Sequence, residues 1–310
     1  ILAVSPTRTA PDNRTVYTLT ATSNSLLRVS GVSTASPSSY STVASTGYIS
    51  TCVLGSRIYG TDGEKVVSID PRAADGYGRI LKPNLSGTFP KKPRLIWAWN
   101  QRLCMGRGVD PHLVFMAAIG NPHDANTLPA EKSGFEAVTF ALDAPLTTAI
   151  PFTDDLLLLS TAGGVHRQTG DPAQGGRLDR VADMYGMPFG EPWCKDDAGN
   201  VYAFMSHGGV TRMSPSGKMD SISDARMKRR FESIDLTEFN IRLVWNDGAR
   251  GLHVFLCPAD FSGTAPTTHY FYETETGAWY EDSLPFVVTC ARSIDKDGTG
   301  NRAVWMGCQD

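Results

Sequence analysis

FTDDLLLLSTAGGVHR, residues 152–167, aligns without a gap with DAGNVYAFMSHGGVTR, residues 197–212. Both stretches end in Gly-Gly-Val-x-Arg, and the offset from Arg167 to Arg212 is 45 residues. A repeat of about 40–45 residues is the size of one four-stranded β-propeller blade. The shared positions are Gly163, Gly164, Val165 and Arg167 in the first copy, and Gly208, Gly209, Val210 and Arg212 in the second.

Each copy contains one apolar run between two turn signals. Asp, Asn and Gly residues, which suit a hairpin turn, precede the runs at 156–159 and 201–204. A run of this length suits a strand that is buried on both faces. The glycine pair then turns the chain into a further strand. Because one sheet cannot cover both of its own faces, neighbouring copies must pack against it.

Weaker copies of the unit occur at residues 57–67, 97–105, 246–256 and 295–307. With the pair above they make about six units. We therefore predict an all-β chain whose residues 47–310 form a β-propeller of about six, or seven, four-stranded blades. Residues 270–280 add a predicted hairpin that belongs to the outer strands of a blade.

Other segments depart from the repeat. Residues 1–46 are rich in Ser, Thr and Pro, and we predict an irregular or extended segment with the start of the first blade. Residues 121–147 are predicted to be a long loop between blades. Residues 223–234 are predicted to form a short helix, with three apolar side chains at i, i+4 and i+7. The end at 307–310 resembles the start of a turn, so we expect the polypeptide to continue.

Composition excludes several classes of protein. The net charge of −3 argues against a general nucleic-acid binder, which needs a dense basic surface. No apolar run reaches the roughly 18 residues of a membrane-spanning helix. The six cysteines form no Cys-x-x-Cys pair. We expect buried free thiols made in a reducing compartment, with a disulfide framework or a zinc site as the alternatives.

Catalytic and metal-binding patterns are weak. The motifs of nucleophilic hydrolases, zinc proteases, phosphate loops and dinucleotide-binding folds do not occur, so we expect no enzyme and no cofactor. Residues 293–299 partly match a sialidase Asp-box, and they contain a partial calcium-loop pattern. His166 and His207 hold similar places in the two copies and could form a metal pair. We expect structural turns and no metal at these positions.

Two groups of residues are candidates for an interaction surface. Arg226, Lys228, Arg229 and Arg230 cluster on the predicted helix, where they could contact phosphates or an acidic partner, or lie on a solvated face. Trp97 and Trp279 could stack on a ligand such as a glycan, or pack between blades.

The middle of the chain resembles propeller-bearing virion proteins of tailed bacteriophages, especially the tail nozzle and head-to-tail stabilisation proteins of short-tailed phages. The resemblance spans about residues 150–290. The residues that carry it are 149–172, 175–181, Tyr185-Gly186, 208–210, 222–224 and 231–235.

This resemblance implies a structural role and no catalytic residues. It implies a homo-oligomeric ring, a hexamer being one form, in the tail or neck of the virion. The ring would surround the channel through which genomic DNA passes during ejection, and its partners would be other tail or neck proteins. The chain would be synthesised in the host cytoplasm. A host-surface glycan-binding module and a propeller glycosidase are the alternative functions.

Overall fold

The computed structural model describes residues 2–6, 14–22, 25–31, 48–70, 78–83, 87–127, 136–181, 185–259, 267–294 and 302–309. The chain divides into two compact units, and each is described by itself. One unit covers residues 3–184, and the other covers residues 185–310 together with residues 1–2.

The unit of residues 3–184 contains one three-stranded sheet and three four-stranded sheets. The three-stranded sheet is β1 (Leu2–Pro6), β2 (Arg14–Thr22) and β3 (Ser25–Gly31). The next two are β4 (Ser50–Leu54), β5 (Arg57–Thr61), β6 (Val66–Ile69) and β7 (Gly78–Ile80), then β8 (Leu95–Trp99), β9 (Arg102–Gly106), β10 (Leu113–Met116) and β11 (Val138–Ala141). The last is β12 (Leu146–Thr153), β13 (Leu156–Thr161), β14 (Gly164–Thr169) and β15 (Arg177–Val181).

The unit of residues 185–310 contains two four-stranded sheets and one two-stranded sheet. The first is β16 (Trp193–Lys195), β17 (Val201–Phe204), β18 (Val210–Met213) and β19 (Met219–Ser221), followed by α1 (Lys228–Glu232). The second is β20 (Phe239–Asn246), β21 (Gly251–Pro258), β22 (Thr267–Glu273) and β23 (Ala278–Leu284). The two-stranded sheet is β24 (Val287–Ile294) and β25 (Ala303–Gln309).

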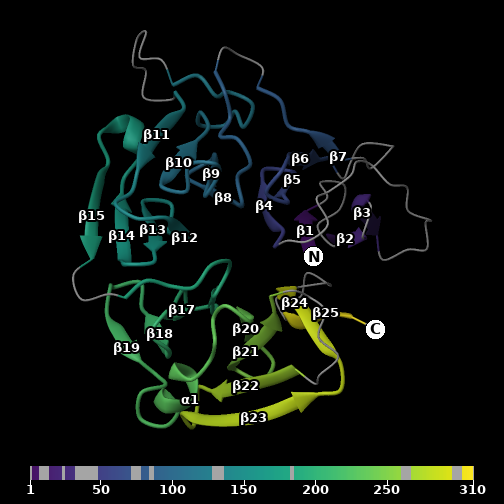
Figure 1. The fold of residues 1–310 in the computed structure, drawn as a ribbon, viewed down its shortest axis with the longest axis vertical. Helices are drawn as coiled ribbons and strands as arrows, with labels where there is room; N and C mark the ends of the chain where they lie inside the picture. Colours follow the sequence, from purple (N-terminus) through teal and green to yellow (C-terminus); the bar gives the residue numbers. More distant parts are fainter. Residues whose placement is uncertain are drawn as a thin grey trace. The chain divides into compact units, whose positions relative to one another are not determined.

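Within every four-stranded sheet the strands follow one another in order and pair antiparallel. Figure 1 shows these sheets, with colours that follow the order of the sequence. In each unit the first strands of successive sheets contact one another: β4 with β8, β8 with β12, β16 with β20, and β20 with β24. The second strands are the most apolar, and Leu157, Leu159 and all of β17 are buried. Sheets packed face to face bury these strands on both sides, as the repeat requires.

The predicted all-β propeller module is confirmed. Five sheets have all four strands within the described residues, and two further sheets have three and two strands. The copy at 57–67 covers β5 and the start of β6, the second and third strands of their sheet. The copy at 246–256 runs from the end of β20 into β21, the first and second strands of theirs. The hairpin at 270–280 is formed by β22 and β23, and Gly277 at its tip has a φ of 65°. Residues 33–46 and 295–301 lie outside the described residues.

Two sequence predictions need correction. Residues 121–147 were predicted as a loop between blades, but β11 lies within them and completes the second four-stranded sheet. β11 is a four-residue edge strand with alternating half-buried and exposed side chains. Its sequence therefore has too little apolar character to be distinguished from a loop. The helix is confirmed at Lys228–Glu232, but it has five residues, because residues 224–227 form turns before it. For residues 1–46 the prediction was an irregular or extended segment with the start of the first blade, and residues 2–6, 14–22 and 25–31 form the strands of one sheet.

The apolar face predicted for the helix is confirmed. Phe231 is buried, while Met227 and Ile234 are partly buried and pack on the same cluster. Among the described residues no helix has the length and apolar character that crossing a membrane requires.

Candidate functional site

The two Gly-Gly-Val segments occupy the same place in their sheets. Residues 163–165 link the second and third strands β13 and β14, and residues 208–210 link β17 and β18. Val165 and Val210 are both completely buried. The arginine of each copy lies opposite an aspartate on the fourth strand, Arg167 opposite Asp179 and Arg212 opposite Asp220. The repeat therefore extends to a cross-strand pair that the sequence alignment did not include.

The Asp residues that precede the apolar runs at 156–159 and 201–204 lie in or beside turns, as their residue type predicts. Asp154 and Asp155 form the turn between β12 and β13. Asp196 precedes the turn between β16 and β17, and its carboxylate accepts hydrogen bonds from the backbone and side chain of Asn200 at 2.8 and 2.6 Å. Turn hydrogen bonds therefore account for the Asp196 carboxylate.

Trp97 does not belong to an interaction surface. Its side chain lies in β8, is only 6% exposed, and packs within the interior of the sheet stack. The indole Nε1–H has no hydrogen-bond partner. A ring buried in this way cannot stack on a ligand, so the predicted surface role of Trp97 is wrong, and its packing between blades is the better interpretation.

Trp279 is also occupied by contacts within the protein. Its Nε1–H donates to the carbonyl oxygen of Ile222 at 3.1 Å, and its ring lies 5.2 Å from the ring of Phe231 at an angle of 77°. The side chain attaches the segment around α1 to the outer hairpin β22–β23. These contacts within the protein account for a tryptophan at position 279, and no glycan is needed to explain it.

The basic residues of the helical segment separate into two groups. Arg230 donates to the Tyr270 hydroxyl at 3.1 Å and pairs with Glu281, which ties α1 to β22 and β23. Arg226, Lys228 and Arg229 are exposed. A surface role therefore remains a prediction for these three cations, whereas Arg230 has a structural role.

The two histidines of the repeat have separate partners. His166 is buried and bonds to the Asp143 carboxylate at 2.8 Å, while His207 is exposed and stacks on Tyr185 with ring centroids 4.0 Å apart. Within the described part of the chain, no group of three or more His, Cys, Asp or Glu side chains is arranged to hold a metal ion.

The five cysteines whose side chains are described are free thiols. Burial raises the pKa of Cys104 and of Cys194 well above the usual value, and it raises the pKa of Cys257 to about 12. These thiols stay protonated at neutral pH, as expected for cysteines that act as small apolar side chains.

A buried ion pair joins two neighbouring sheets in the unit of residues 3–184. Arg102 of β9 is completely buried, and its Nε and Nη2 donate to Asp171 at 2.6 and 2.9 Å. Asp171 also accepts from the Ala173 backbone and caps the 3-10 turn Pro172–Gln174. Such a bidentate pair fixes the geometry of the loop between β14 and β15. The sequence contained no signal that linked the two residues, because they are 69 positions apart.

A second charged contact joins three sheets in the unit of residues 185–310. Glu191, just before β16, accepts from Arg242 of β20 at 2.8 Å and from Arg292 of β24 at 3.0 Å. Burial raises the pKa of Glu191, but Arg292 and Arg242 lower it more, so the pKa is below its usual value. Both units therefore use arginine–carboxylate contacts between blades.

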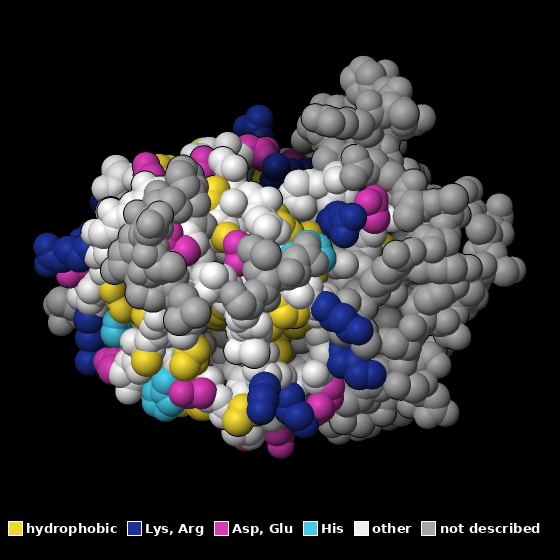
Figure 2. Space-filling model, turned by 90° about the horizontal axis from the view of Figure 1, so that it is seen from above, with side chains coloured by type: hydrophobic (Ala, Val, Ile, Leu, Met, Phe, Trp, Pro, Cys, Tyr) yellow, Lys and Arg dark blue, Asp and Glu magenta, His cyan; other side chains and the backbone are white. Residues whose placement is uncertain are grey.

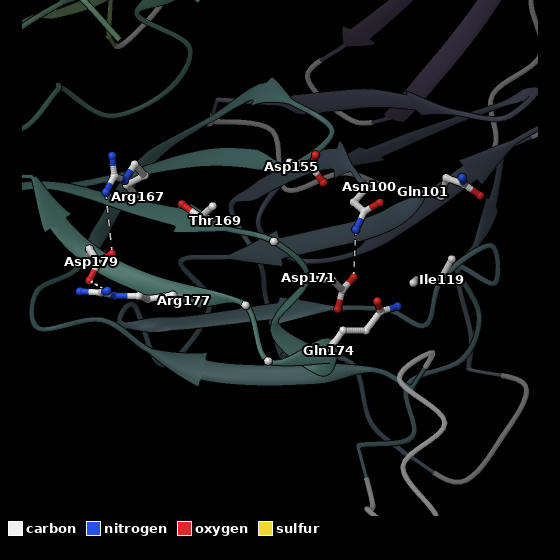
Figure 3. Close-up of a pocket in the computed structure, with 13 residues that line it drawn as sticks. Asn100, Gln101, Ile119, Asp155, Arg167, Thr169, Asp171, Gln174, Arg177 and Asp179 are labelled. Atoms are coloured by element: carbon white, nitrogen blue, oxygen red, sulfur yellow. Dashed lines mark hydrogen bonds and ion pairs between the residues drawn. The ribbon is translucent and has the colours of Figure 1, made fainter. Parts of the chain in front are cut away.

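The candidate functional site is a cleft of about 830 Å³ between the sheet β8–β11 and the sheet β12–β15. Its walls are the turn between β8 and β9, the turn between β12 and β13, and the loop between β14 and β15 (Figure 3). A volume of this size lies within the range of about 300–1,000 Å³ that is typical of small-molecule sites. The lining residues are Asn100, Gln101, Ile119, Asp155, Arg167, Thr169, Gly170, Asp171, Gln174, Gly175, Gly176, Arg177 and Asp179.

Only part of this cleft was visible in the sequence. Arg167 was a candidate because of the repeat, and Gly170 to Pro172 belong to the stretch that resembles phage tail proteins. Arg177 belongs to the stretch 175–181 of the same resemblance, whereas Gln101 and Gln174 were not singled out. The glycine-rich loop after β14 was the one signal that could have drawn attention to them.

The face shown in Figure 2 carries Lys and Arg side chains scattered among Asp and Glu, with hydrophobic side chains between them. Among the described residues on this face there is no continuous basic surface of the kind that general binding to nucleic acid requires. The balance agrees with the net charge of −3.

Comparison with known proteins identifies the fold. No protein-family model matches the chain. No curated protein matches its sequence. Among solved structures, the chain is similar to the extracellular domain of a "putative one component system" from B. thetaiotaomicron, with 14% identity and a TM-score of 0.55 over 99% of this chain and 38% of that one.

Two further solved structures match over most of their own length. BBS1N in complex with ARL6DN has 8% identity and a TM-score of 0.56, over 98% of this chain and 86% of that one. A "putative 6-phosphogluconolactonase" from Bacteroides uniformis has 13% identity and a TM-score of 0.55, over 96% of this chain and 86% of that one. The fold is a β-propeller. At these identities the likeness shows the propeller fold alone.

Proposed function

We propose that this β-propeller is a structural component of a tailed-phage virion, in the tail or neck, where it forms part of an oligomeric ring around the DNA exit channel. The observation that carries the proposal is the order of the motifs that resemble phage tail proteins. A Gly-Asp-Pro turn follows the third strand β14, the second Gly-Val turn follows β17, and a short helix comes next. The same order is expected for the propellers of tail nozzle proteins.

The contacts between blades support a mechanical role. The pair Arg102–Asp171 and the contact of Glu191 with Arg242 and Arg292 each join sheets that follow one another in the sequence. Removing one partner of the buried pair Arg102–Asp171 would cost about 3–5 kcal/mol, so this contact holds its two blades together. Resistance to sliding is what a part of a DNA conduit needs.

The exposed cations beside α1 are the proposed contact with a neighbouring tail protein. Arg226, Lys228 and Arg229 lie on a segment that Phe231 and Trp279 hold in place. A fixed segment that presents three cations suits an acidic surface on a partner.

Mass spectrometry of purified virions tests the proposal directly. We expect the chain among the particle proteins, at several copies per particle, and cryo-electron microscopy should place it in the tail or neck. Absence of the chain from particles that contain all other tail proteins would overturn the proposal.

A variant tests the proposed contact. The triple change Arg226→Glu, Lys228→Glu and Arg229→Glu should lower incorporation into particles at least tenfold without unfolding the chain. The control is Lys91→Glu, an exposed cation on the loop before β8, which should leave incorporation unchanged. Equal incorporation of the triple variant would show that these cations do not form the contact.

A further inference from the structure

The cleft of Figure 3 has two electrically different ends. At one end, Arg177 donates to Asp179 at 2.6 Å, and Arg167 lies 3.9 Å from the same carboxylate. Two guanidinium groups thus share one carboxylate, and both remain largely exposed, at 53% for Arg167 and 80% for Arg177. The exposed Asp155 lies near the middle of the cleft, and Gln101 and Ile119 lie at the other end (Figure 3). The cleft is therefore cationic at one end and uncharged at the other.

Neutral hydrogen-bonding side chains line the rest of the cleft. Gln101, Thr169 and Gln174 are exposed and line the cleft. Together they offer amide and hydroxyl groups that both donate and accept. Ile119 is the one apolar side chain among the residues that the structure places in the lining.

The backbone of the cleft is held in a demanding conformation. Asn100 and Gln101 have φ values of 46° and 57°, as in a two-residue hairpin turn. Asparagine tolerates this region, but glutamine does not favour it, and glycine would fit at a lower energetic cost. Strained backbone conformations cluster at functional sites, so the side chain of Gln101 is a candidate for contact with a ligand.

The opposite wall is equally constrained. Gly170 and Gly175 have φ values of 68° and 85°, and a Cβ on Gly176 would lie 2.3 Å from the carbonyl oxygen of Gly170. The Asp171 carboxylate anchors this loop to Arg102 and to Asn100. The polar groups of the two walls are therefore positioned before any ligand arrives.

We propose that this cleft binds a carboxylate-bearing sugar chain, a site that goes beyond the structural function proposed above. Arg167 and Arg177 take the sugar carboxylate, since a guanidinium matches that group in a bidentate geometry. Gln101, Thr169, Gln174 and Asp155 bond to the hydroxyl groups. A protein partner would need an apolar anchor in a dry pocket, and this lining offers only Ile119.

The experiment is isothermal titration of the purified chain with tri-galacturonate, 3′-sialyllactose, lactose, the methyl ester of tri-galacturonate, and pentaglutamate. We expect at least one of the two acidic sugars to bind at least tenfold more tightly than its neutral counterpart and than pentaglutamate. Because the cationic end is exposed, the affinity should fall with added salt. Failure of both acidic sugars to bind, or equal binding of the neutral sugars, would overturn the proposal.

Variants assign the binding to the cleft. Arg177→Ala and Arg167→Ala should each weaken the binding of the acidic sugar at least tenfold, and Gln101→Gly should weaken it without loss of fold. The matched control is Arg212→Ala, which removes the equivalent arginine of the other repeat copy and lies outside the cleft. Unchanged affinity in the two arginine variants, or preferred binding of pentaglutamate, would contradict the sugar site. Neither result bears on whether the chain is present in virions.

Discussion

The two Gly-Gly-Val turns share their sequence and their place in the sheet, but their glycines serve different purposes. In the first copy, Thr161 pairs with Gly164 across a two-residue turn, and a Cβ on Gly163 would meet nothing within 4 Å. In the second, Gly208 and Gly209 have φ values of 84° and 119° within a longer loop. A Cβ on Gly208 would lie 2.5 Å from the backbone nitrogen of Glu232.

The cause of the difference is the segment 222–236, which follows the second copy alone. Ser223 accepts a hydrogen bond from the backbone of Val210 at 2.8 Å, and Phe231 packs on Phe204 of β17. The second turn therefore carries a tertiary interface, while the first faces solvent. Identical residues in equivalent positions can thus differ greatly in how far substitution is tolerated.

The largest effect is expected when the interface loses its central side chain. Phe231 is only 1% exposed and contacts the rings of Phe204, Tyr270 and Trp279. Phe231→Ala should lower the free energy of unfolding by about 3–5 kcal/mol, measured by urea denaturation. Lys228→Ala on the exposed side of the same helix is the control and should change it by less than about 0.5 kcal/mol. Similar values for the two variants would show that α1 is not packed as described.

Acid should affect the unit that holds the second turn. Burial lowers the pKa of His253 to about 4, and His269, stacked on it with ring centroids 5.4 Å apart, is lowered as well. The folded state therefore binds fewer protons than the unfolded state, in which histidine has a pKa of about 6.5. The stability that the neutral His253 ring contributes is present above about pH 6.5 and is lost as the pH falls towards 4.

That loss should reach about 3 kcal/mol, because the pKa of His253 falls from 6.5 in the unfolded chain to about 4 in the folded protein. Urea denaturation between pH 7 and pH 4, followed by hydrogen exchange, measures it within residues 185–310. His253→Phe, which keeps a ring beside Phe255 and Phe271, should remove most of the pH dependence. An unchanged pH profile in this variant would assign the acid sensitivity to other groups.

The glycines themselves give the sharpest paired test. Gly208→Ala should lower the free energy of unfolding by about 2–3 kcal/mol, because alanine is strained at this φ and its Cβ meets the backbone of Glu232. Gly163→Ala should change it by less than about 0.5 kcal/mol, since the space beside Gly163 is open. Equal effects in thermal or urea unfolding would remove the distinction between the two turns.

A smaller effect is expected from the hydrogen bond that ties the segment to the turn. Ser223 is completely buried, so Ser223→Ala leaves the backbone N–H of Val210 without its partner. The expected loss is about 1–2 kcal/mol. Ser216→Ala, at an exposed position in the turn after β18, is the control. Faster amide exchange at Val210 in the first variant alone would identify the broken bond.

The smallest effect concerns the arginine that ends each repeat. Arg167 and Arg212 both lie on the third strand opposite an aspartate, and both are exposed. Replacement of either by alanine should change the free energy of unfolding by about 0.5 kcal/mol or less, because both side chains are exposed and the ion pair of Arg167 with Asp179 lies at the surface. A loss above about 1 kcal/mol for either variant would reveal a structural role that the exposed position does not suggest.

Much of the fold could be predicted because it depends on local patterns. The runs at 156–159 and 201–204 are apolar on every residue, and a strand between two packed sheets requires this. The turns at Asp154-Asp155 and Thr276-Gly277 follow the conformational preferences of their own residues. By contrast, β11 was missed, because a four-residue edge strand has little apolar signal.

The candidate site was largely hidden from the sequence. Gln101, Asp155 and Gln174 come from three separate loops, and no short-range pattern connects them. The sequence left two roles open for Trp97, since a tryptophan in a strand can be exposed or buried according to what packs on it, and the structure shows that it is buried.

The amino-acid sequence alone determined that this chain is built from repeated antiparallel sheets, because hydrophobic periodicity and turn preferences act over a few residues. Tertiary structure alone decided which glycine has a neighbour, which tryptophan is buried and which arginine meets a carboxylate 69 residues away. The reason is physical: burial and ion pairing depend on distances between segments, and those distances exist only after the sheets have packed.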